Sequence, residues 1–226
     1  MTVEFWRGRG YSFGQAPVQV ALGTCEQMNR DVLLTGTPVT VPELRVLSAG
    51  LLQAQFGADG LRWVRWNGTE VLRAVQFLVR KPGWGTATSQ ISGLTVNQDA
   101  SGFAVRYRAQ YGAAGAGLVV DIAYHGTAGQ LTAQADIRAE APFDTNRTGF
   151  VILHPLTGFA GTEVVVEHAS GPTRNVTIPL LISPGQPVFD MRAITHHPAP
   201  GLTVQTRFAG DVFEMEDQRT WTAPSF

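Results

Sequence analysis

The sequence predicts an all-β protein, a large antiparallel β-sandwich. Apolar and polar residues alternate with a period of two through most of residues 44–226, and turn residues interrupt the alternation about every ten positions. Helical periodicity is scarce. We expect about ten to fourteen strands, more than one open twisted sheet usually holds, and therefore two sheets packed face to face about 10 Å apart.

A β-meander opens the sandwich. Its three predicted strands are residues 51–56, 61–66 and 70–79. Asp-Gly at 59–60 and Asn-Gly at 67–68 separate them, and both dipeptides supply the positive φ that tight turns require. Within the middle strand, we expect Trp63 to lie in the core and Trp66, beside its turn, to be exposed.

Further hairpins follow in chain order. Residues 99–102 form the turn of a hairpin whose second strand places Phe103, Val105 and Tyr107 on one apolar face. The remaining predicted strands are residues 118–125, 131–139, 163–168, 174–178 and 202–208. Each alternates in the same way, so we expect one continuous antiparallel sandwich over residues 44–226.

Residues 1–43 do not follow this apolar–polar alternation, because they are rich in glycine and are interrupted by Pro38 and Pro42. We interpret them as a partly ordered leader that precedes the sandwich domain, residues 44–226. The leader contains Gly10-Tyr-Ser-Phe-Gly14, which matches the nucleophile elbow G-x-S-x-G. That motif requires a buried strand before it and a helix after it, and the sequence predicts neither, so we interpret the match as chance.

Charge and hydropathy exclude several classes of partner. The chain has 17 Lys and Arg residues and 18 Asp and Glu residues, so it has no excess of positive charge that would attract a nucleic acid or an anionic membrane. The longest apolar stretch, Gly117–Ala123, is far shorter than the about 20 residues that cross a bilayer. A lone cysteine, Cys25, and the lack of a secretory signal fit a reducing compartment. We therefore expect a soluble, cytoplasmic protein without nucleic-acid or membrane partners.

Polar residues with catalytic potential gather toward the C-terminal end: His154, Asp190, Arg192, His196, Glu214, Glu216, Asp217 and Arg219. In an extended strand, Glu214 and Glu216 share a face and Asp217 points the other way. Paired carboxylates beside a histidine or an arginine can perform acid–base chemistry on a sugar or a lactone. The same residue types would anchor a neighbouring domain through ion pairs, and we favour this second interpretation.

We expect neither a metal nor a cofactor. His196 and His197 suggest a metal site, but adjacent residues of an extended chain face opposite sides, and no third ligand stands at a recognisable spacing. His154 follows three apolar residues and precedes Pro155, which also fits a structural histidine at a strand end.

Four segments resemble the D-apionate lactonase family. In chain order they are Gly60–Arg73 (GLRWVRWNGTEVLR) with Trp84-Gly-Thr86, Thr145–Leu156 (TNRTGFVILHPL), Ile182–His196 (ISPGQPVFDMRAITH) and Phe208–Thr222 (FAGDVFEMEDQRTWT). The resemblance covers residues 44–226 and implies a mutarotase-like sandwich (supersandwich) of the kind that precedes a catalytic barrel in these bacterial enzymes. They open D-apionolactone to D-apionate during apiose catabolism, so the resemblance implies a sugar acid or sugar lactone as ligand.

Lactone hydrolysis needs a general base for water and stabilisation of the negative charge that grows on the carbonyl oxygen. The roles that we assign are Glu216 or Glu214 as base, Arg192 or His154 as electrophilic contact, and Asp190, His196, Asp217 and Arg219 as substrate-binding groups. Because the resemblance reaches the point where the barrel would begin, we expect the domain to be non-catalytic or incomplete alone and to work with a catalytic barrel domain or polypeptide.

Two alternatives stay open. One is a carbohydrate-binding or scaffolding module. The other is a sugar epimerase of mutarotase type, which would require His154 and Glu214 to flank a sugar ring at about 6 to 8 Å from each other.

Overall fold

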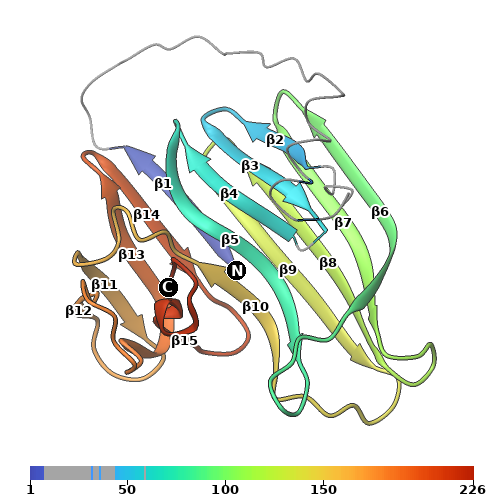
Figure 1. Ribbon diagram of the computed structural model, residues 1–226. Coiled ribbons are helices and arrows are strands. Elements are labelled where there is room, and N and C mark those ends of the chain that lie inside the picture. Colours follow the sequence, from blue (N-terminus) through green and yellow to red (C-terminus); the bar gives the residue numbers. More distant parts are fainter. Residues whose placement is uncertain (8–31, 33–35, 37–43, 59) are drawn as a thin grey trace.

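Two antiparallel β-sheets lie face to face in the computed structural model, which describes residues 1–7, 32, 36, 44–58 and 60–226 (Figure 1). The larger sheet has ten strands and the smaller sheet has five. The predicted antiparallel β-sandwich is therefore confirmed.

The smaller sheet contains β2 (Arg45–Ala49), β3 (Leu52–Gly57), β4 (Gly60–Trp66), β5 (Thr69–Arg80) and β10 (Arg147–Leu153), in the order β10-β5-β4-β3-β2. Strands β3 to β5 are the predicted meander. Positive φ at Gly60, Asn67 and Gly68 closes its two turns, as the turn dipeptides indicate.

The larger sheet contains β1 (Thr2–Arg7), β6 (Ser89–Asp99), β7 (Gly102–Tyr111), β8 (Leu118–Thr127), β9 (Gln130–Ala139), β11 (Glu163–His168), β12 (Arg174–Thr177), β13 (Val188–Ala199), β14 (Leu202–Arg207) and β15 (Phe213–Met215). Its order is β12-β11-β13-β14-β1-β9-β8-β7-β6, and β15 pairs with β13. A short 3-10 helix, η1 (Gln218–Trp221), follows β15.

The main core fills the space between the two sheets. Its largest fully buried side chains include Leu52, Leu61 and Leu72 of the smaller sheet and Tyr124 and Leu131 of the larger one. These residues occupy the apolar positions of the two-residue alternation, so the pattern that predicts the strands also builds the core.

Strand β1 differs from the prediction. Thr2–Arg7 belongs to the range that the sequence assigns to the leader, yet it pairs with β14 over six residues and with β9 over three. Val3 and Phe5 are buried in the main core, so this segment is part of the sandwich. The rest of the leader, including Gly10–Gly14, lies outside the described residues apart from positions 32 and 36.

The two tryptophans of β4 reverse the expected arrangement. Trp66 is buried and stacks on Phe5, with ring centroids 5.1 Å apart. Trp63 is only partly buried, has φ of 52°, and lies under the guanidinium of Arg73. The register with β3 shifts by one residue beside Trp63, and this bulge inverts the alternation in the middle of the strand.

A second, smaller core lies among β11, β13, β14, β15 and the C-terminal segment. Its buried members are Phe159, Val164, Val166, Ile178, Val188, Met191, Ile194, Phe208, Met215 and Phe226. Figure 1 shows these strands together at one end of the larger sheet, with η1 against them. All eight candidate site residues belong to this C-terminal lobe, residues 154–226, so the lobe positions the candidate site.

Candidate functional site

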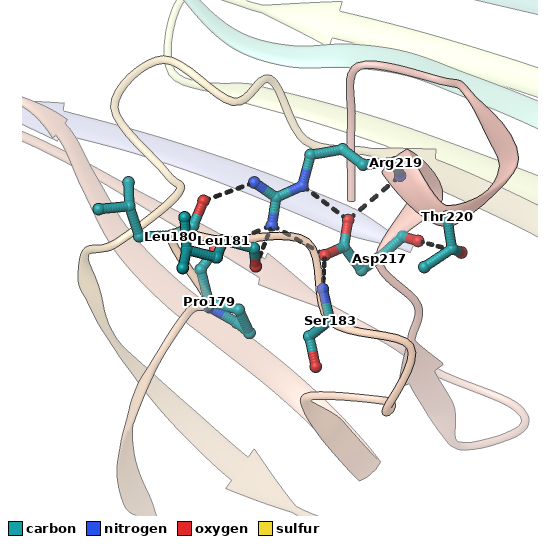
Figure 2. A network of polar contacts seen from close by, with 7 residues as sticks. All are labelled: Pro179, Leu180, Leu181, Ser183, Asp217, Arg219 and Thr220. Carbon is teal, nitrogen blue, oxygen red and sulfur yellow. Dashed lines mark hydrogen bonds and ion pairs between the residues drawn. The ribbon is translucent and has the colours of Figure 1, made fainter.

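Asp217 and Arg219 form the densest polar network of the lobe, and Figure 2 shows it. The guanidinium donates from Nε to Asp217 Oδ1 and from Nη2 to Asp217 Oδ2, at 2.8 Å each. It also donates to the carbonyl oxygens of Pro179, Leu180 and Leu181 at 3.0, 2.7 and 3.0 Å. All three nitrogens of Arg219 are therefore engaged by the chain itself.

Asp217 has a second structural role as the N-cap of η1. Its Oδ1 accepts from the backbone N–H of Arg219 at 3.1 Å, and its Oδ2 accepts from the N–H of Ser183 at 2.9 Å. The hydrogen bond from the Arg219 side chain is the main reason why the pKa of Asp217 lies below its usual value, and the same pair raises the pKa of Arg219. The carboxylate is consequently held in its charged form.

His154 and His196 meet inside the second core. Their ring centroids are 5.3 Å apart, His154 stacks on Phe159 at 4.3 Å, and both histidines are almost fully buried. Within the described residues, neither His154 Nδ1 nor either ring nitrogen of His196 has a hydrogen-bond partner. Burial lowers the pKa of His154 to about 4 and lowers that of His196 well below 6.5, so both rings are neutral at pH 7.

Glu214 and Glu216 are partly exposed on either side of the buried Met215. Glu214 forms an ion pair with Arg147, the first residue of β10. Glu216 Oε2 accepts from the Gln218 side chain at 3.2 Å. Both glutamates are thus more exposed than Met215, and each has a different partner.

Asp190 and Arg192 lie on β13 where its pairing with β15 is irregular. Asp190 has φ of 53°, and its carboxylate accepts from the Ser170 hydroxyl at 2.7 Å. Arg192 donates to the carbonyl oxygens of Gly210 and Asp211 at 3.0 and 3.3 Å. Both side chains thus fasten neighbouring loops to β13.

The structure brings together two pairs of the predicted site residues, His154 with His196 and Asp217 with Arg219. Within the described residues, no hydrogen bond or ion pair connects Glu214, Glu216 or Arg192 to either pair. The epimerase alternative gains no support. Glu214 pairs with Arg147, the first residue of β10, whereas His154 follows the last residue of that strand. The backbones of Arg147 and His154 are therefore about 20 Å apart along the extended strand, much farther than the 6 to 8 Å that an epimerase would need between Glu214 and His154.

Two surface hollows are candidate ligand sites. One of about 220 Å³ lies beside Asp190 and is lined by His168, Ser170, Gly171, Pro172 and Arg174. The other, of about 230 Å³, lies on β7, β8 and β9 and is lined by Ala104, Arg106, Ala123, Tyr124, His125, Thr132 and Gln134. Both are smaller than the 300 Å³ or so at which a pocket begins to enclose a small-molecule ligand.

Comparison with known proteins decides the family. A family model described as "D-apionate lactonase, N-terminal domain" matches residues 32–226. The chain belongs to this family. A D-apionate lactonase from Brucella anthropi is 45% identical over 196 residues, which are 86% of this chain and 32% of the relative. The chain therefore spans about a third of the length of that lactonase, and the comparison with solved structures gives no significant match.

The match confirms the resemblance of the four sequence segments to the D-apionate lactonase family. Among the described residues, no helix has the length and apolarity to span a membrane, and no group of three or more His, Cys, Asp or Glu is arranged to hold a metal ion. Catalytic and substrate-binding roles for the eight candidate residues stay predictions.

Sequence reasoning missed two features of the lobe. The ion pair of Glu214 with Arg147 joins residues 67 positions apart, and no local pattern indicates it. The other feature is a row of exposed apolar side chains at Leu180, Leu181 and Ile182. Three consecutive apolar residues before Ser-Pro-Gly were a visible signal, because a solvated loop rarely contains them.

Proposed function

We propose that this chain serves as the sandwich domain of a D-apionate lactonase-like hydrolase, which opens D-apionolactone to D-apionate in apiose catabolism, and that it does not catalyse the reaction alone. Membership of the N-terminal domain family supports the assignment. We further propose a cytoplasmic location and a mutarotase-like arrangement of the sandwich, since one cysteine fits a reducing compartment and two large antiparallel sheets fit that architecture.

The observation that carries the non-catalytic proposal is that the charged candidates already have partners within the domain. Asp217 and Arg219 neutralise each other, and Glu214 is paired with Arg147. A lactonase needs a free base and a free donor for the developing oxyanion. Groups that stabilise loops in this way are poorly suited to either task.

Glu216 differs from Glu214 and Asp217 because, within the described residues, its carboxylate accepts from the neutral side chain of Gln218 and forms no ion pair. We propose Glu216 as the group that this domain would contribute to a reaction centre shared with a catalytic domain. The carboxylate is partly exposed, so a substrate held by a neighbouring domain could reach it.

Acidification assays with D-apionolactone test both proposals. We expect no rate above the uncatalysed reaction for the purified chain, and hydrolysis by a chimera in which the chain replaces the aligned third of the Brucella anthropi lactonase. Turnover by the chain alone would overturn the non-catalytic proposal. In the chimera, Glu216→Gln should lower kcat while Glu214→Gln should not, and equal rates for all three proteins would remove Glu216 from the mechanism.

A carbohydrate-binding role is the second candidate. The hollow on β7, β8 and β9 supports it, because Arg106, His125, Thr132 and Gln134 offer polar groups on a solvent-facing sheet. A melting temperature that rises with added D-apionate, and is insensitive to added D-glucose, would favour this role. No shift up to millimolar sugar acid would exclude it.

A further inference from the structure

The loop between β12 and β13 exposes an unusual amount of apolar surface. Leu180, Leu181 and Ile182 are 69%, 81% and 61% exposed, and Trp221 of η1 is 72% exposed. We call these four residues the apolar ridge. Three of them are consecutive in the chain, whereas the large apolar residues that a soluble monomer exposes are normally scattered singly over its surface.

The ridge is rigidly presented. Arg219 binds the carbonyl oxygens of Pro179, Leu180 and Leu181, and Asp217 binds the backbone N–H of Ser183 (Figure 2). These charge-assisted hydrogen bonds fix the backbone of residues 179–181 and 183 relative to η1. A surface held in one conformation loses little entropy when a partner covers it, which is a property of docking sites.

The network also determines the chemistry of the partner. Asp217 and Arg219 neutralise each other beneath the ridge, so the ridge offers apolar area and leaves no unpaired charge from this network. Exposed leucine, isoleucine and tryptophan side chains suit the buried centre of a protein–protein interface, which is apolar and poor in charged residues. The ridge therefore fits an apolar protein surface better than a sugar or an anion.

We propose that the apolar ridge is the surface on which the remaining part of a D-apionate lactonase packs, the polypeptide that follows the N-terminal domain in this family. The matched lactonase has about two thirds of its length outside the aligned region. Phe226, the last residue that the domain model matches, lies under the Arg219 guanidinium at 4.7 Å and exchanges backbone hydrogen bonds with His154. The C-terminal end of the family match therefore lies against the same guanidinium that holds the ridge loop.

This inference rests on the proposed function, and cysteine footprinting tests it separately from hydrolysis. In a Cys25→Ser background, Leu181→Cys and the control Val46→Cys are placed both in the chain alone and in the lactonase chimera. Val46 is 62% exposed on β2, a strand of the other sheet. Maleimide labelling is followed by mass spectrometry, which assigns the modified position.

We expect position 181 to react at least about tenfold more slowly in the chimera than in the chain alone, because a covered interface core excludes solvent, and position 46 to react equally in both. Equal labelling of position 181 in both proteins would overturn the docking proposal, even if the chimera hydrolyses the lactone. Protection of position 181 in a chimera without activity would uphold docking and count against the proposed function. Sedimentation of the chain alone as a dimer that Leu181→Asp dissociates would assign the ridge to a second copy and would also overturn it.

Discussion

The buried histidine pair predicts that the C-terminal lobe loses stability in mild acid. His154 has a pKa of about 4 in the folded protein and 6.5 as its ordinary value. Above pH 6.5 the ring is neutral in both states, so it has no effect. Between pH 6.5 and 4 only the unfolded chain takes up the proton, and the free energy of unfolding therefore falls as pH falls.

The expected magnitude follows from the difference between the two pKa values. At pH 5, His154 alone should lower the free energy of unfolding by about 2 kcal/mol relative to pH 8, and the loss should level off near 3 kcal/mol below pH 4. His196 acts in the same direction, because burial, with a smaller effect of His154, also depresses its pKa. Other titrating groups contribute as well, so the test is a comparison of variants.

Urea unfolding at pH 8 and pH 5 provides that comparison. His154→Phe keeps an aromatic ring to stack on Phe159 and removes the titrating group, so it should lose about 2 kcal/mol less than the wild type between the two pH values. Thr206→Val is the control, because Thr206 is buried on the neighbouring strand β14 and carries no titrating group, so its loss of stability between the two pH values should equal that of the wild type. Equal losses for wild type and His154→Phe would refute the reasoning.

Three further variants test the packing of the sandwich and its lobe. Arg219→Ala removes the counter-ion of the buried Asp217 carboxylate and should cost about 3 kcal/mol of unfolding free energy, whereas Arg108→Ala, which breaks an exposed ion pair, should cost much less. Similar losses in urea unfolding would mean that the buried pair does not stabilise the lobe. Phe5→Ala removes a buried ring that stacks on Trp66 and should cost about 3 to 5 kcal/mol, and an unchanged melting temperature would show that β1 does not contribute to the core.

The meander could be predicted from sequence because its determinants are local. Asn67-Gly68 and the apolar alternation around it define two strands and their turn within a few residues. Strand β1 could not be placed in the same way, since its partners lie about 130 and 200 positions away. A strand signal was nevertheless present in the sequence, because the apolar Val3 and Phe5 alternate with the polar Thr2 and Glu4. The pattern is only six residues long, and the glycine-rich sequence after Arg7 favoured a leader instead.

The candidate site was predictable as a region and not as a set of contacts. Alternation correctly places Glu214 and Glu216 on a more exposed face than Met215 and Asp217. No sequence pattern, however, shows that Arg219 binds carbonyl groups about 40 positions away. Such contacts form only because tertiary packing brings the loop before β13 next to η1.

The pKa shifts of Asp217 and His154 support the proposal that this domain does not catalyse the reaction alone. A general base at neutral pH needs a pKa close to 7, and active sites raise carboxylate values to reach it. Here the pKa of the Asp217 carboxyl is lowered and that of His154 falls to about 4, so each moves away from that range. The same contacts that lower these values hold η1, the ridge loop and the second core in place. The lobe is therefore better suited to presenting a rigid apolar surface to a partner than to exchanging protons with a substrate.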